Sequence, residues 1–123
     1  MPTPRFPPRP IHVVLHSDLA RLREALRGQA KAGVKDSQTL LRSIERVSEI
    51  LARDFQHGEV VPKDRIPPSL VSRFGISNLY VEDLPGFRRL LYSVEGDESS
   101  VKVLLLLLVD HPEYDRLFRV RGR

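Results

Sequence analysis

Residues 78–109 decide the fold, and they read NLYVEDLPGFRRLLYSVEGDESSVKVLLLLLV. Two turn signals, Pro85-Gly86 and the polar loop 96–100, divide this stretch into three extended segments. We expect these segments to form strands joined as two consecutive hairpins. The last segment, 101–109, is almost entirely apolar, which is typical of a strand covered on both faces or on one face plus an oligomer contact. A buried helix would also fit the apolarity, but the short run directly after a hairpin favours a strand.

Upstream of this stretch, the sequence predicts a first strand followed by two amphipathic helices. Residues 11–15 form a short apolar run suited to a strand. Behind it, apolar side chains recur at spacings of three and four residues, which places them on one face of a helix. The first helix carries Leu15, Leu19, Leu22 and Leu26 on that face, and the second carries Leu40, Ile44, Val47, Leu51 and Phe55. We expect the second, longer helix to end at Gly58.

The remaining segments complete an α+β pattern. Residues 60–75 contain three prolines and the basic side chains Lys63, Arg65 and Arg73, so we expect a basic connecting loop with a helical turn over 69–73. Pro112 suits the first turn of a last short helix. The sequence thus predicts an α+β fold with an N-terminal strand, a two-helix hairpin packed on a small, mainly antiparallel sheet, and a short C-terminal helix.

The length of the chain, 123 residues and 14.1 kDa, is close to that of one domain. Five prolines among the first ten residues disfavour helix and strand, so we expect 1–10 to be an extended arm and 11–123 a single domain. The longest apolar run, 103–109, is far shorter than the roughly 20 residues that a membrane helix needs. No secretory signal stands at the N-terminus, so the expected location is the cytoplasm, without membrane contact.

Composition also narrows the chemistry. The absence of cysteine excludes disulfides, thiol nucleophiles and cysteine zinc sites. The glycines are scattered at turns and form no phosphate-binding loop. His12 and His16 lack the further ligands that a zinc site needs. We therefore expect no metal and no cofactor, and histidine and carboxylate chemistry remain.

The charge distribution favours phosphate-bearing partners without requiring them. The formal net charge is +4 and the pI is about 9.8, with the basic excess in the N-terminal third of the chain. A second basic cluster ends the chain and consists of Arg116, Arg119, Arg121 and Arg123. Such a cluster either follows a phosphate backbone or forms a solvated tail.

Two adjacent arginines form the first group of candidate functional residues. Arg88 and Arg89 lie in the second of the three expected strands, where successive side chains point to opposite faces. One of them must emerge on a face where a charge is tolerated. That charge is satisfied either by an ion pair with Glu82 or Asp83 across the hairpin or in a concave, solvent-filled site.

The second group, residues 110–116, follows the apolar strand and gathers at the end of the sheet. His111, Tyr114 and Arg116 are residue types that serve phosphoryl transfer. Histidine moves a proton near neutral pH, and arginine neutralises the charge on a pentavalent phosphate. The structural alternative is that His111 caps or pairs locally with Asp110 and that Tyr114 belongs to the core.

The order of elements and two short motifs resemble the RelE/ParE superfamily of toxins from type II toxin-antitoxin systems. Members of this family carry a strand reading roughly Tyr-Arg-x-x-Tyr after a turn, then a hydrophobic strand and an ending that runs from His or Arg to Tyr. Here Arg89-Leu-Leu-Tyr92 matches the strand motif, and the segment from His111 to Tyr114 resembles the ending. The resemblance covers residues 11–118 in topology and 79–114 in motif.

The resemblance implies a toxin that binds in the ribosomal A site and cleaves mRNA without a metal. The ribose 2′-hydroxyl would attack the adjacent phosphate and leave a 2′,3′-cyclic phosphate. Arg89 would stabilise the phosphate charge, and His111 or Tyr114 would move the proton. The residues implied in binding the RNA are Lys63, Arg65, Arg73, Arg88 and Arg116. The implied partners are a cognate antitoxin, mRNA and the ribosome, with a homodimer when the antitoxin is absent.

Two further classes of function stay open on the sequence. Glu82 and Asp83 stand where RelE-like nucleases often carry basic residues, and Arg116 is offset from the usual second arginine. ParE-like members of the same fold inhibit DNA gyrase without RNA-cleaving residues, so a non-catalytic binding protein of this fold is the alternative. A structural interaction domain would use its arginines only in surface ion pairs.

Overall fold

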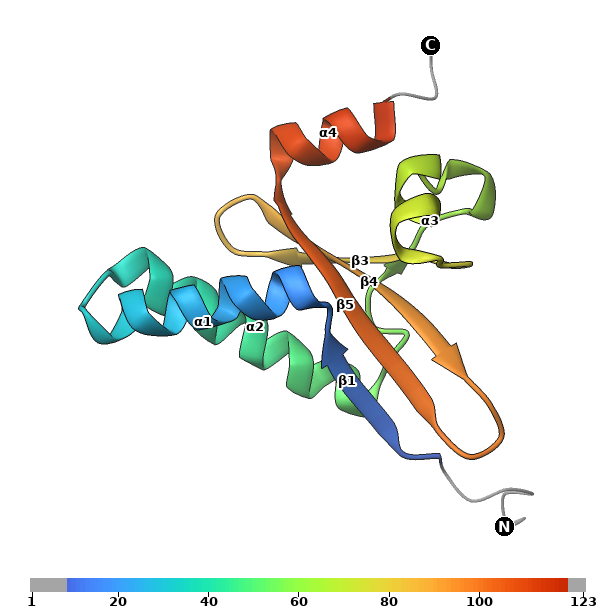
Figure 1. Cartoon of the computed structure of the whole chain (residues 1–123), viewed down its shortest axis with the longest axis horizontal. Helices are drawn as coiled ribbons and strands as arrows, with labels where there is room; N and C mark the ends of the chain where they lie inside the picture. The colour runs from blue at the N-terminus through green and yellow to red at the C-terminus, as the bar shows by residue number, and fades with distance from the viewer. Residues whose placement is uncertain (1–8, 120–123) are drawn as a thin grey trace.

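Five strands form one sheet in the order β1-β5-β4-β3-β2 (Figure 1). The computed structural model describes residues 9–119. The strands are β1 (Ile11–Leu15), β2 (Glu59–Val60), β3 (Tyr80–Leu84), β4 (Arg88–Gly96) and β5 (Val101–Asp110). β1 runs parallel to β5, and every other neighbouring pair is antiparallel, which confirms the small, mainly antiparallel sheet.

β5 is an interior strand between β1 and β4, and both of its faces are covered, as its apolar sequence predicts. Val103 and Leu105 face the core beneath the two long helices, whereas Leu106 and Val109 face the opposite core. A β-bulge interrupts the pairing with β4, because Leu91 pairs with Leu107 while Tyr92 pairs with Leu105. The β5 side chains that face the two cores, Val103, Leu105, Leu106 and Val109, are at most 4% exposed.

The two long helices, α1 (Ser17–Lys31) and α2 (Lys35–Arg53), pack against each other and cover one face of the sheet (Figure 1). The predicted apolar stripe of α2 is buried from Leu40 to Leu51. The other face packs against α3 (Pro68–Phe74) and α4 (His111–Arg119). The expected α+β architecture is therefore confirmed, including the short C-terminal helix.

The end of α2 differs from the prediction. The helix ends at Arg53, and Phe55 lies beyond it, although its ring still packs against the same core. Gly58 has a different role, because a Cβ atom at this position would lie 2.7 Å from the hydroxyl oxygen of Tyr92 and 2.8 Å from the carbonyl oxygen of Val81. Glycine is thus needed for close packing and not to stop the helix.

Residues 60–75 are more regular than a connecting loop with one helical turn. The edge strand β2 pairs with β3, a 3₁₀ turn spans Lys63–Arg65, and α3 extends one residue beyond each end of the predicted turn. The two-residue strand β2 is too short to show a hydrophobic period, which is why the sequence pattern missed it.

The terminal predictions fall partly outside the described residues. Residues 1–8 of the proline-rich arm, and Arg121 and Arg123 of the C-terminal cluster, lie there. Between residues 9 and 119, no helix combines the length and the apolarity that crossing a bilayer demands.

Candidate functional site

The two groups of candidate residues meet at one end of the sheet, where β4 begins and β5 ends. In the antiparallel register, Arg88 pairs with Asp110 and Arg89 pairs with Val109. α4 begins directly after β5, so its first turn stands beside the start of β4. The antiparallel pairing therefore brings together residues that are 20 or more positions apart in the sequence.

Arg89 is the arginine that faces α4. Its guanidinium carbon lies 4.3 Å from the centre of the Tyr114 ring, and its Nε donates a hydrogen bond to Asp83 Oδ1 at 3.2 Å. The Arg89 side chain is 31% exposed, whereas that of Asp83 is 84% exposed. Arg89 therefore combines the two alternatives that the sequence left open for its charge. It makes the ion pair across the hairpin, and it also lines a hollow at the surface.

The first hollow, of about 400 Å³, opens at the β3–β4 turn. Its lining residues are Asp83, Leu84, Gly86, Phe87, Arg88, Arg89 and His111. Three of these carry or can carry a positive charge, and one is a carboxylate. The hollow therefore combines anion-binding groups with the histidine of α4, as a site for a phosphate ester requires.

A second hollow, of about 710 Å³, lies between β2 and α4. Its lining residues are Glu59, Val60, Val61, Pro62, Asp64, Arg65, Val81, Tyr114 and Phe118. The Tyr114 and Phe118 rings stack with their centres 4.2 Å apart. Because Tyr114 lines this hollow and contacts Arg89 of the first, the Arg89–Tyr114 pair connects the two.

The environment of Tyr114 keeps its hydroxyl protonated. Partial burial is the largest cause that raises its pKa, and the carboxylates of Glu59 and Asp83 act in the same direction. The guanidinium of Arg89 opposes them. Since the balance lies above the ordinary tyrosine value of 10.0, Tyr114 at neutral pH is able to donate a proton but not to accept one.

His111 is accessible and is oriented by its own helix. Its Nδ1 lies 3.4 Å from the Asp115 carboxylate one turn further along α4, and its side chain is 55% exposed. The local partner is therefore Asp115 and not Asp110, whose carboxylate instead accepts a hydrogen bond from the backbone N–H of Glu113. This arrangement leaves the imidazole on the wall of the first hollow.

The predicted RNA-binding residues separate into those at the two hollows or on α4 and those that lie elsewhere. Arg88 lines the first hollow, Arg65 lines the second, and Arg116 is exposed on α4. Arg73 lines neither hollow, because its guanidinium binds Asp18 of α1 at 2.7 Å. Lys63 lies on another part of the surface, beside Ser77 and Asn78.

Sequence reasoning missed two residues of this region, Phe87 and Glu59. Phe87 lines the first hollow and is 85% exposed, and Glu59 lines the second. An aromatic residue directly after Pro85-Gly86 was a usable signal, since polar residues predominate in turns. No pattern marked Glu59, because it belongs to the two-residue strand β2.

No metal cluster occurs in this region. Across residues 9–119, no three His, Asp or Glu side chains are grouped as a metal ion would require.

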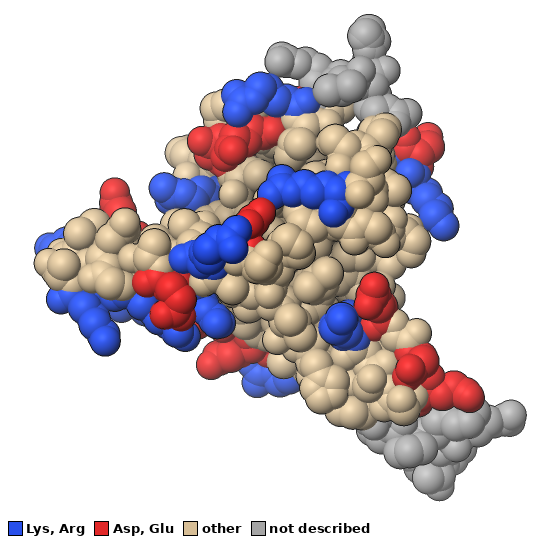
Figure 2. Space-filling view, viewed as in Figure 1, with Lys and Arg blue, Asp and Glu red and all other residues tan. Residues whose placement is uncertain are grey.

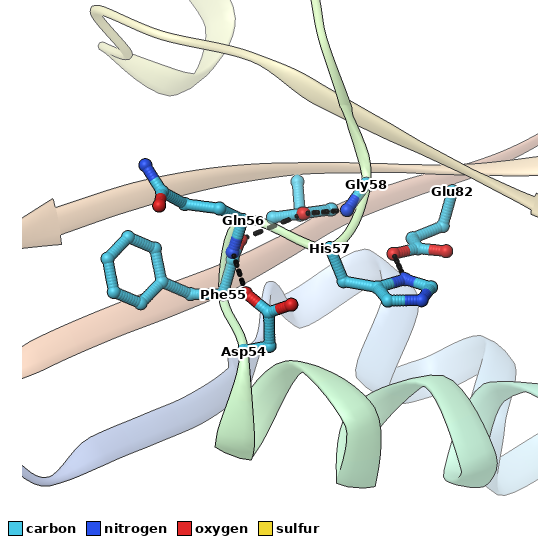
Figure 3. A network of polar contacts seen from close by, with 7 residues as sticks. Asp54, Phe55, Gln56, His57, Gly58 and Glu82 are labelled. Atoms are coloured by element: carbon cyan, nitrogen blue, oxygen red, sulfur yellow. Dashed lines mark hydrogen bonds and ion pairs between the residues drawn. The ribbon is translucent and has the colours of Figure 1, made fainter.

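A second polar cluster lies on the opposite face of the sheet and joins the α2–β2 connection to the strands (Figure 3). The Tyr92 hydroxyl donates to the Phe55 carbonyl at 2.9 Å and accepts from the Gly58 N–H at 3.0 Å. His57 Nδ1 lies 2.7 Å from the buried carboxylate of Glu82. His57 therefore follows the end of α2 and pairs with β3.

The His57–Glu82 pair predicts a pH-dependent stability. The hydrogen bond to Glu82, together with its negative charge, raises the pKa of His57 above its ordinary value of 6.5. The protonated pair therefore stabilises the fold fully below about pH 6.5, and this contribution is lost as the pH rises through the raised pKa. We expect the difference in unfolding free energy between the wild type and His57→Ala to be larger at about pH 5.5 than at about pH 8.5. Urea unfolding at both pH values measures it, and a difference that does not change with pH would contradict the pairing.

Compared with protein-family models and with curated proteins, the chain gives no match. The fold and the geometry of the site are therefore the basis for assigning a function.

Proposed function

We propose that the chain is a RelE-type toxin, a metal-independent endoribonuclease that cleaves mRNA on the ribosome. One observation carries this proposal: Arg89 contacts Tyr114 at 4.3 Å and lines the same hollow as His111. These three residue types supply positive charge, a proton donor and a proton acceptor. The order of strands and helices supports the same family.

In the proposed reaction, the oxygen of a ribose 2′-hydroxyl attacks the adjacent phosphorus while the bond from phosphorus to the 5′-oxygen of the next nucleotide breaks. One proton leaves the 2′-hydroxyl, and another must reach the departing 5′-oxygen. The products are a 2′,3′-cyclic phosphate and a 5′-hydroxyl. Arg89 stabilises the extra negative charge that develops on the phosphate oxygens.

The environments of His111 and Tyr114 divide the two proton transfers between them. Asp115 orients the exposed imidazole of His111, which acts as the base for the 2′-hydroxyl. Tyr114 holds its proton at neutral pH, and the adjacent guanidinium of Arg89 favours its anion, so it is the acid that protonates the 5′-oxygen. We expect His111→Ala and Tyr114→Phe each to slow cleavage, because each variant lacks the group for one of the two proton transfers, and single-turnover assays on programmed ribosomes measure the loss.

Asp83 holds Arg89 without blocking it. The Asp83 side chain is largely exposed, and an exposed ion pair of this kind is worth only about 0 to 1 kcal/mol. A phosphate group is a better bidentate partner for a guanidinium and is able to displace the carboxylate. Asp83 would thus keep Arg89 oriented in the free protein and release it to the substrate.

Surface charge gives this proposal only general support. Figure 2 shows Lys and Arg side chains spread over the face viewed, with Asp and Glu between them. A net charge of +4 favours approach to ribosomal RNA, and Arg65, Arg88 and Arg116 are the basic residues placed to bind the message. The proposal implies a cytoplasmic location, an antitoxin partner and a homodimer in its absence.

A second candidate is a non-catalytic RelE/ParE-fold protein that binds DNA gyrase or another partner. It is favoured by the carboxylates Asp83 and Glu59 around Tyr114, which weaken the positive potential that a phosphate would meet. In that case Arg89 and Tyr114 would stabilise the end of the sheet.

The test is incubation of the folded protein with ribosomes programmed with a defined mRNA, followed by mapping of the new 3′ ends. A supercoiling assay with gyrase runs in parallel. The nuclease proposal expects cleavage within the A-site codon and unchanged supercoiling. Intact mRNA together with inhibited gyrase would support the second candidate with gyrase as its partner, and two negative results would exclude both the nuclease and the gyrase inhibitor.

A further inference from the structure

The tip of the β3–β4 hairpin presents an aromatic ring to solvent. Leu84 pairs with Arg88, so the turn consists of Pro85, Gly86 and Phe87. Phe87 is 85% exposed, more than any other large hydrophobic residue in the described part of the chain. Neither of the two cores includes it. Burial therefore gives no reason for an aromatic side chain at this position.

The backbone gives no reason either. Phe87 has a φ of 59°, and it is the one non-glycine residue between positions 9 and 119 with a positive φ. This left-handed conformation favours glycine or asparagine and disfavours bulky side chains. A sequence selected for stability alone would not place phenylalanine here, so the ring indicates a contact outside the chain.

The groups around Phe87 indicate what that contact is. The ring lines the same hollow as Arg88, Arg89 and His111. A Cβ at Gly86 would lie 3.0 Å from Arg88 Nη1, so the Arg88 guanidinium is folded against the backbone of the tip. Asp83 is the one carboxylate in the lining. An exposed ring beside two guanidiniums is the arrangement by which proteins stack a base and hold the adjoining phosphates.

We propose that Phe87 is a stacking platform for a base of single-stranded RNA, with Arg88 binding the phosphate beside it. The inference rests on the proposed function in one respect: the stacked base belongs to the nucleotide next to the phosphate that Arg89 stabilises. Stacking accepts any base, because every base has a π face, so this contact gives affinity and position without sequence preference. A protein partner inserting against the ring is the competing outcome of the test.

The chain offers a direct reporter because it contains no tryptophan. In Phe87→Trp, the introduced indole is the sole one and keeps an aromatic face at the tip. Titration with a short single-stranded RNA carrying 2′-O-methyl groups, which prevent cleavage, is expected to quench its fluorescence. A blunt DNA duplex of the same base sequence, whose bases are already stacked, is expected to leave the fluorescence unchanged. No quenching by the single strand would overturn the proposal.

Phe87→Gly and Phe87→Leu measure the contribution of the ring. Glycine suits the positive φ, so we expect Phe87→Gly to be at least as stable as the wild type but to bind the RNA fivefold or more weakly, as loss of about 1 kcal/mol of stacking requires. Phe87→Leu keeps an apolar side chain without a π face and is expected to lose binding as well. RNA binding retained by Phe87→Leu would overturn the stacking role, because leucine has no π face, and would leave the apolar contact with a protein as the alternative.

The outcomes separate this inference from the proposed function. Cleavage by the wild type with no change in binding for Phe87→Gly would overturn the stacking role alone. Quenching of the indole without any mRNA cleavage would support the stacking role and contradict the nuclease. Val34→Ala, which removes another exposed hydrophobic side chain at the start of α2 and away from both hollows, is the matched control and should leave RNA binding unchanged.

Discussion

Replacing Arg89 by alanine is expected to slow mRNA cleavage by about 10²- to 10³-fold, the usual loss when one group that stabilises transition-state charge is removed. The reason is its position: Arg89 contacts Tyr114 at 4.3 Å and lines the hollow that His111 shares. The neighbouring Arg88 also lines this hollow, but it is the residue folded against the turn. Single-turnover cleavage on programmed ribosomes measures the change.

The fold should survive this substitution, because the Arg89 ion pair with Asp83 is largely solvated and worth only about 0 to 1 kcal/mol. Arg42→Ala, which removes an exposed arginine of α2 on the helical side of the sheet, is the matched control for net charge. Equal cleavage by the wild type and Arg89→Ala would contradict the assignment of this site. If Arg89→Ala and Arg42→Ala slowed cleavage equally, the loss would result from the lower net charge of the protein and not from the position of Arg89.

Replacing Tyr92 is expected to have the largest effect on stability. Its side chain is fully buried and is stacked on Tyr80 with ring centres 5.0 Å apart. Tyr92→Phe leaves the Phe55 carbonyl and the Gly58 N–H without their partner and should lower the unfolding free energy by about 1 to 3 kcal/mol. Tyr92→Ala also removes the ring and should lower it by about 3 to 5 kcal/mol.

Chemical denaturation of the two variants measures both steps, and a cost of Tyr92→Phe near zero would show that the hydroxyl is dispensable. The same variant separates structure from chemistry. Although Tyr92 belongs to the motif that resembles the RelE family, it faces α1 and α2, whereas Arg89 faces α4. We therefore expect Tyr92→Phe to cleave mRNA normally at a temperature where it is folded.

The elements with a clear hydrophobic period or an explicit turn were predictable from the sequence. The apolar stripe from Leu40 to Leu51 and the apolar run of β5 predicted burial, and both are buried in the structure. β2 and the true end of α2 were not predictable, because they depend on contacts between distant residues. Gly58, for instance, is glycine because it touches Tyr92, which lies 34 positions later.

The candidate site was predictable in its residues but not in its arrangement. Alternation along a strand showed that one of Arg88 and Arg89 must meet the end of the sheet, but the choice depended on the register of the turn. The three-residue turn ending in Phe87 sets that register and directs Arg89 toward α4. The burial of Tyr114 is a tertiary feature that no local pattern carries. The pairing of His111 with Asp115, by contrast, follows from their four-residue spacing on one helix and was predictable from the sequence.

The most direct test of the account is to compare a message with ribose at every position with one that carries a single 2′-deoxyribose at the nucleotide that is cleaved. The proposed reaction requires the 2′-hydroxyl as its nucleophile. We expect the wild-type protein to cut the all-ribose message on programmed ribosomes and to leave a 2′,3′-cyclic phosphate, while the deoxy message stays intact at that position. An all-ribose message that is not cut, or a deoxy message that is cut equally well, would contradict the account.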